Sequence, residues 1–176
     1  MAGFRLNLEL ADGFAAVPEI LNRTRRQLDL AAARALRKTG QWLRTHSTRE
    51  IAKELGIVQS PIRHRYSIYS QATANQVKVW VGLQPISVHY LGDPKQTATG
   101  VKVGHRIYDD AFIGQMKNGP EMVFRRKGRE RLPLERVTED WEGPAMTVLE
   151  RWEQRAQRRF VELFEQEARY VLEGTR

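Results

Sequence analysis

Cysteine is entirely missing from this 176-residue chain. Its absence excludes disulfide bonds, thiolate zinc sites and cysteine nucleophiles, and it is compatible with a reducing compartment. Long apolar runs are missing as well, because no segment approaches the roughly 18–20 uninterrupted apolar residues of a membrane span. The first ten residues lack the apolar core of a secretory signal. We therefore expect a protein that is made in the cytosol and has no membrane partner.

Catalytic motifs are also missing. The histidines lie in separate segments without metal-ligand spacing: His46, His64, His89 and His105. Residues 100–104 lack the Gly-Lys-Ser/Thr ending of a phosphate-binding loop. Asp109 and Asp110 are adjacent carboxylates in a segment with turn chemistry, where Asp is expected for local hydrogen bonding. We predict no enzyme, no catalytic residue, no metal site and no cofactor. A Mg²⁺-dependent nuclease that uses these two carboxylates is the least favoured alternative.

Positive charge, in contrast, is abundant. The chain has 29 Lys and Arg residues and 21 Asp and Glu residues, a net charge of +8 at pH 7. Such a bias favours an acidic partner, whether nucleic acid, an anionic membrane or an acidic protein face, although solubility alone also explains it. The densest basic segment contains Arg125, Arg126, Lys127, Arg129 and Arg131, with Glu130 as its single acid. We predict a loop at a strand end that contacts DNA phosphates or an acidic neighbouring subunit; a solvated hairpin tip is the third interpretation.

The N-terminal third of the sequence has the patterns of one strand and two helices. Alternating apolar side chains over residues 4–10 predict a half-buried strand. Apolar residues at three- and four-residue steps predict a long amphipathic helix over about 17–46, with arginines on its opposite side. Ser47 and Glu50 have the spacing of a capping box, which predicts a second, shorter helix that closes at Gly56.

The rest of the sequence predicts a block of strands and a final helix. Short apolar runs bounded by Gly, Pro and Asp predict strands near 65–69, 77–81, 86–91, 101–103, 111–116 and 122–125. The polar segment 95–100 is expected to be an exposed loop, and Gly143-Pro144 predicts a stop before an amphipathic helix over 147–172.

The order of these elements indicates an α+β fold, since helices and strands are segregated without βαβ alternation. We expect a mainly antiparallel sheet packed by a long N-terminal helix and a long C-terminal helix. We expect one domain, with an N-terminal strand and helices over 1–60, a β-rich block over 61–142 and the C-terminal helix over 143–176.

Several short motifs follow one another in a distinctive order. They are Ile62-Arg63-x-Arg65, Val77–Val81, Gly100-Val101-x-Val103, Ala111-Phe112-Ile113, Val123-Phe124-Arg125-Arg126, Arg131-Leu132-Pro133-Leu134 and Gly143-Pro144-Ala145-Met146. In this order they resemble the minor tail protein Z family of tailed phages and prophages, and more broadly phage head–tail joining and tail-completion proteins. Leu134 stands where the family has Ile, and Ala145-Met146 stands where it has Ser-Val. The resemblance extends from about Leu36 to the start of the last helix.

The resemblance implies a virion structural protein at the neck, where the tail tube meets the head. It implies a homo-oligomeric ring, commonly sixfold, around the DNA path. Other neck and tail proteins would be partners, and double-stranded DNA is a further candidate. The protein would lie in the host cytoplasm before assembly. Pro133 and Pro144 would fix the chain direction, and Phe112 and Phe124 would be core residues. A sequence-independent DNA-binding protein, motivated by the charge of +8, is the alternative.

Overall fold

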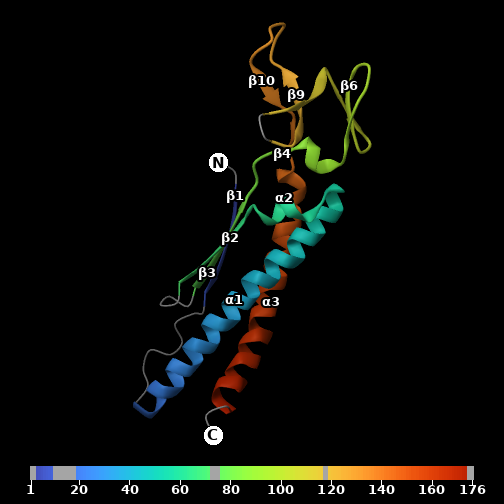
Figure 1. Cartoon of the computed structure of the whole chain (residues 1–176). Coiled ribbons are helices and arrows are strands. Elements are labelled where there is room, and N and C mark those ends of the chain that lie inside the picture. Colours follow the sequence, from blue (N-terminus) through green and yellow to red (C-terminus); the bar gives the residue numbers. More distant parts are fainter. Residues whose placement is uncertain (1–2, 10–18, 72–75, 117–118, 174–176) are drawn as a thin grey trace.

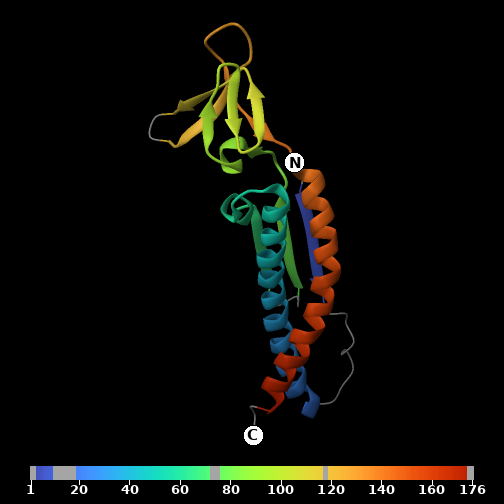
Figure 2. The same ribbon diagram turned by 90° about the vertical axis from the view of Figure 1, so that its right-hand side faces the viewer.

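Two long antiparallel helices run along most of the length of an elongated molecule (Figure 1). The structure is a computed structural model that describes residues 3–9, 19–71, 76–116 and 119–173. Helix α1 (Glu19–Leu55) leads towards one end, and α3 (Glu142–Glu173) returns beside it. Figure 2 shows most of the remaining strands gathered in a β-lobe at that end. Helices and antiparallel sheets are segregated, which confirms the predicted α+β class.

A three-stranded antiparallel sheet covers one side of the helices. Its strands are β1 (Gly3–Glu9), β2 (Tyr66–Gln71) and β3 (Gln76–Gly82), in the order β1-β3-β2. Because successive side chains in a strand point to opposite faces, alternate residues reach the helices. The buried residues of this face are Phe4, Leu6, Tyr66, Val77, Val79 and Val81. We call β1–β3 with the three helices the helical part of the molecule; it includes the short α2 (Gln59–Arg63).

The apolar stripe predicted for the last helix is buried over most of its length. Leu149, Trp152, Ala156 and Leu163 of α3 are buried, whereas Leu172 near its end is 44% exposed. On α1 the alanines at 31, 32 and 35 are fully buried, and their small side chains allow close approach of the packed elements. The helices are therefore joined by an apolar contact that runs along both of them.

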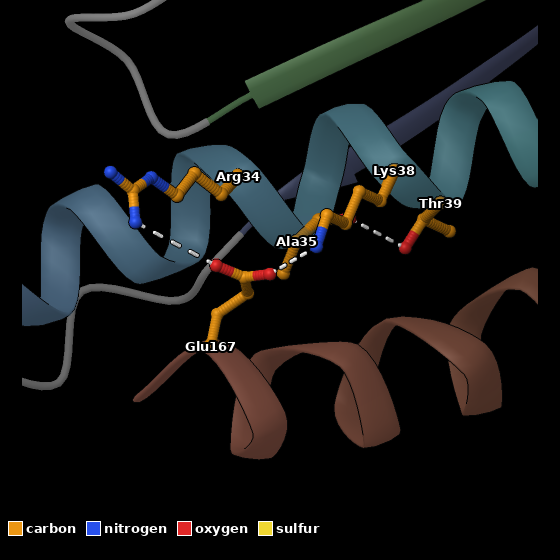
Figure 3. Close-up of polar contacts among 5 residues, drawn as sticks. All are labelled: Arg34, Ala35, Lys38, Thr39 and Glu167. Carbon is orange, nitrogen blue, oxygen red and sulfur yellow. Dashed lines mark hydrogen bonds and ion pairs between the residues drawn. The ribbon is translucent and has the colours of Figure 1, made fainter. Parts of the chain in front are cut away.

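A buried carboxylate joins α1 to the far end of α3 (Figure 3). The Glu167 side chain is 8% exposed; it accepts a hydrogen bond from Lys38 Nζ and lies 3.9 Å from Arg34 Nη1. On the same stretch of α1, the Thr39 hydroxyl donates to the Ala35 carbonyl at 2.8 Å. Because a buried carboxylate is costly without a partner, this cluster favours one register of the two helices.

The prediction of two separate helices before residue 56 is wrong, because α1 continues to Leu55 without a break. Ser47 donates a 2.6 Å hydrogen bond to the carbonyl of Leu43 within the helix and lies 2.7 Å from the Tyr66 hydroxyl. Burial raises the pKa of Tyr66 to about 12. Gly56 has a φ of +67°, as expected of the residue that follows a helix end. The predicted start near 17–18 lies outside the described residues.

The other half of the expected capping box, Glu50, also binds a distant partner. Its carboxylate accepts a 2.6 Å hydrogen bond from Trp152 Nε1 and lies 2.8 Å from Arg151 Nη2. The Trp152 ring stacks on His46 with centroids 5.4 Å apart and meets Trp42 edge-on at 5.2 Å. Glu50 therefore joins α1 to α3, and Ser47 joins α1 to β2, rather than capping a helix start.

The β-lobe contains three small antiparallel sheets. One sheet consists of β5 (Pro94–Gln96), β6 (Gly100–Val103) and β7 (Arg106–Asp109), in that order. A second consists of β8 (Ala111–Gln115), β9 (Glu121–Arg126) and β10 (Leu134–Arg136), and the third pairs β4 (Ile86–Ser87) with β11 (Thr138–Glu139). Their core is a separate cluster of small apolar residues: Val88, Val101, Val103, Ala111, Val123 and Val137.

Three boundary predictions in this half of the chain are corrected. The expected strand at 86–91 ends at Ser87 and continues as the 3₁₀ helix η1 (Val88–Leu91), because Val88 turns into the β-lobe core. Part of the expected 95–100 loop is strand β5, and β7, β10 and β11 were not predicted. Helix α3 begins at Glu142 rather than at 147, so Pro144 lies in its first turn, where a missing N–H costs little.

The segment Gln84–Pro85 links the two parts of the molecule. The buried Trp141 donates from Nε1 to the Gln84 carbonyl at 2.7 Å. Arg65 donates to the carbonyls of Gln84 and Pro85 at 3.1 and 3.2 Å. The expectation of a single domain remains a prediction that this link supports. Within the described part of the chain, no helix is long and apolar enough to cross a membrane.

Candidate functional site: the basic loop between β9 and β10

The predicted basic segment forms the end of β9 and the loop that leads to β10. The two strands pair antiparallel, with Arg126 opposite Leu134, and residues 127–133 connect them. The loop projects from the β-lobe at the end of the molecule farthest from the C-terminus (Figure 2). The structure therefore confirms that the basic segment lies at a strand end and continues into a loop.

The Arg125 side chain is hydrogen-bonded within the β-lobe itself. Its Nε and Nη2 atoms donate to the carbonyl oxygen of Asp109 at 3.1 and 2.8 Å. This contact holds β9 against the turn between β7 and β8, where Asp110 has a φ of 56°. The expected turn at Asp109-Asp110 is thus confirmed, and its carbonyl is an internal partner for one of the five basic residues.

Arg126 and Lys127 also have partners within the lobe. The Arg126 guanidinium lies 5.8 Å from the centre of the Phe112 ring, in a cation–π arrangement. Phe124 is buried as expected of a core residue, whereas Phe112, 6.2 Å away, is only half-buried and lies outside the buried core. Lys127 Nζ lies 3.2 Å from Glu135 on β10. These cations stabilise the hairpin before any partner binds.

Arg129 and Arg131 remain exposed, and within the described chain neither has a hydrogen bond or an ion pair. Between them, the Glu130 carbonyl lies 3.5 Å from Arg126 Nη1. Leu132 follows in the loop and is 67% exposed. The free part of the loop is thus two cations beside a large apolar side chain. This combination suits a protein surface better than a row of phosphates, because apolar anchors are what protein interfaces bury.

The other sites considered from the sequence do not assemble. Among the described residues, no three His, Asp or Glu side chains gather as a metal-binding group. The histidines have unrelated neighbours: His46 stacks on a tryptophan, His64 Nδ1 lies 2.7 Å from the Ser60 carbonyl, and His89 Nδ1 lies 2.8 Å from Ser87 Oγ. The pKa of His89 is lowered by burial and by the nearby charge of Arg136.

Most of the excess positive charge lies elsewhere, on the first long helix, whose arginines were expected from the sequence but not singled out as a site. Helix α1 contains nine Lys and Arg residues and four Asp and Glu residues, a net charge of +5. Residues 86–141, which include the loop, contain ten and eight, a net charge of +2. In α3 the sign is reversed, with five basic and seven acidic residues. The cations of α1 can be counted in the sequence, but helical spacing keeps them apart there. The cations of the loop, in contrast, are next to one another in the sequence.

Comparison with known proteins gives one match. Residues 86–173 match the family model described as prophage minor tail protein Z (GPZ). These 88 residues are half of the 176-residue chain; they begin at β4 and include the β-lobe and α3. The match therefore starts later than the resemblance from Leu36 and continues further along the last helix. No curated protein and no solved structure matches the chain.

Proposed function

This chain belongs to the prophage minor tail protein Z family, a family of phage tail structural proteins, and we propose that it completes the tail as a neck subunit. In this role several copies, six by the expectation from the family, form a ring at the head–tail junction around the DNA path. Other neck and tail proteins bind the faces of the ring. The family match carries this proposal, and the protein acts through its shape rather than through catalysis.

The β9–β10 loop is proposed as the protein-binding element of this subunit. Three of its five cations already have internal partners, so a phosphate would have to compete for them. The free side chains Arg129 and Arg131 closely precede an exposed leucine at position 132. We propose that Leu132 enters an apolar pocket with an acidic rim on a neighbouring subunit or neck protein, since opposite charges around an apolar anchor are complementary.

The ring proposal is tested on the purified protein and on purified tails. Native mass spectrometry is expected to show a closed oligomer, either of the protein alone or after addition of tails that lack it. Electron microscopy is expected to place the protein at the head-proximal end of the tail. A protein that stays monomeric and is absent from tails would contradict the proposal.

The loop proposal needs a variant that changes the anchor without unfolding the lobe. Leu132→Asp places a charge at a side chain that is already 67% exposed, so folding is expected to be unaffected. Ile107→Asp is a matched control, because Ile107 on β7 is 59% exposed in the same lobe but outside the loop. We expect Leu132→Asp to reduce incorporation into tails at least tenfold and Ile107→Asp to have little effect. Equal incorporation of the two variants would exclude the loop as the anchor.

A protein that binds DNA without assembling into tails is the second candidate function, and the net charge of +8 is the observation that favours it. It predicts salt-sensitive binding of duplex DNA by a protein that is not found in tails. Fractionation of infected cells into assembled tails and free protein distinguishes the two candidates.

A further inference from the structure

A basic surface on α1 and α2 is not used by the proposed protein contacts. On α1 a row of exposed residues follows four-residue steps: Arg37, Gln41, Thr45, Arg49 and Lys53. Side chains four residues apart lie next to one another on a helix, so these residues form one ridge along its surface. The ridge contains three cations, two neutral polar residues and no acid.

The ridge ends in an open cavity of about 860 Å³ at the corner between α1 and α2. Arg49 and Lys53 line this cavity from α1, and Arg63 and His64 line it from α2 and its end. No Asp or Glu is among the lining residues. We call Arg37, Arg49, Lys53 and Arg63 the basic ridge; Figure 1 shows α2 beside the end of α1 that carries it.

The four cations of the basic ridge are exposed, and within the described chain none of their side chains has a hydrogen bond or ion pair. Other cations nearby are paired: Lys38 of α1 with Glu167, and Arg151 of α3 with Glu50 of α1. Like charges four residues apart on a helix, such as Arg49 and Lys53, are destabilising by themselves. An anionic ligand would remove this repulsion and supply the partner that the fold does not.

We propose that the basic ridge binds the phosphate backbone of double-stranded DNA. This rests on the proposed function, in which the subunits surround the DNA path, and assigns the face that meets it. A four-residue step turns about 40° around the helix, so Arg37 and Lys53 face different directions. The cations that can meet phosphates of one duplex together are Arg49 and Lys53 of α1 with Arg63 of α2, which line the same cavity. Along the ridge the intervening side chains are the polar Gln41 and Thr45, and at the cavity one apolar side chain, Val58, is 61% exposed.

The test compares two double variants of the full-length protein that remove equal charge. Arg49→Gln with Lys53→Gln changes the ridge, and Arg129→Gln with Arg131→Gln changes the loop. Binding to a labelled duplex of arbitrary sequence is measured by fluorescence anisotropy over a series of salt concentrations. Losing two phosphate contacts is expected to weaken binding and to lower the slope of log affinity against log salt by about 1.8, while the loop variant keeps the wild-type slope.

Several results would overturn the inference. Equal slopes for the two double variants would show a diffuse charge effect, and a wild-type protein that fails to bind duplex at low salt would exclude DNA contact. A ridge variant that binds DNA normally but is lost from tails would indicate an acidic protein partner instead. Circular dichroism and single variants at Arg49 and Lys53 control for folding. Absence of the wild-type protein from tails would refute the neck role alone, because DNA binding by the ridge is measured separately.

Discussion

The helical part and the β-lobe are held together in different ways. The helical part has a broad apolar cluster that includes large side chains such as Leu36, Leu43 and Leu149. The β-lobe has a small cluster made mainly of valines, and polar groups support it. Gln96 is an example, since its side chain donates to the Gly100 carbonyl at 2.9 Å and accepts from the Ile113 N–H at 3.0 Å. Burial of apolar side chains is thus the main source of stability in the helical part, whereas close backbone packing is the main source in the β-lobe.

The largest effect is expected from a change in backbone geometry of the β-lobe. At Gly100 an added Cβ would lie 2.9 Å from the Asp109 Cα atom and nearer still to the Tyr108 carbonyl oxygen. Since β6 and β7 pair through these residues, Gly100→Ala forces the strands apart. We expect hydrogen exchange to show loss of protection in strands β5–β8 with α1 and α3 still protected. Full protection in the β-lobe would show that backbone closeness is not what holds it.

The next effect is expected from a cavity in the helical part. Leu149 on α3 is 1% exposed within the larger apolar cluster. Leu149→Ala is expected to lower the free energy of unfolding by about 2–5 kcal/mol, because the removed methyl groups leave unfilled space. Chemical denaturation monitored by tryptophan fluorescence measures the loss. Glu150→Ala, one residue further along on the exposed side, is the control, and an equal loss there would contradict the packing explanation.

Alkaline pH offers a reversible way to weaken the helical part. The pKa of Tyr66 is raised from 10.0 to about 12, mainly by burial, with the hydrogen bond to Ser47 acting in the opposite direction. The folded state therefore keeps the neutral phenol while the unfolded chain ionises. Stability is unaffected below about pH 10 and falls as the pH rises towards 12, by roughly 2–3 kcal/mol for a shift of this size.

Denaturation of the wild type and of Tyr66→Phe at pH 8 and pH 11.5 measures this contribution. The Phe variant loses a hydrogen bond, so it is expected to be less stable at pH 8, but its stability should fall less between the two pH values. Parallel pH dependence of the two proteins would show that another group is responsible.

The smallest effect is expected at the ion pairs that join the helices. Glu167→Gln keeps the shape of the side chain but removes the charge that Lys38 and Arg34 face. Both cations are about half exposed, so water and salt screen the pairs, and we expect a loss of about 1 kcal/mol. Thermal unfolding at low and high salt measures it. A difference between wild type and variant that does not shrink in high salt would argue against an electrostatic origin.

The sequence predicts the fold class because each long element has a clear period. Leu149, Trp152, Ala156 and Leu163 lie at helical spacing, and all four are buried as expected. The alternation of Val77, Val79 and Val81 likewise predicts β3. Where a segment has one strong period, burial and secondary structure follow from the same residues.

Elsewhere the local pattern is overridden by contacts between distant residues. Ser47 and Glu50 have the spacing of a helix start, but Tyr66 and Trp152, 19 and 102 residues away in the sequence, are their partners. The hydrogen bonds that Arg125 makes within the β-lobe depend in the same way on the position of the Asp109 carbonyl. Charge density along the sequence identified the loop, but the charges of the basic ridge become neighbours only after α1 and α2 have folded.

The division of the chain at Ile86 has a practical consequence for anyone who expresses the family region by itself. That region contains α3, but the helix and sheet on which α3 packs lie before residue 86. A fragment of residues 86–173 would carry Leu149, Trp152 and Ala156 as a bare apolar stripe in water, which favours aggregation. The region that the family model matches is therefore shorter than the smallest fragment expected to be soluble. For that fragment, α1 has to be supplied, in the same molecule or as a separate peptide.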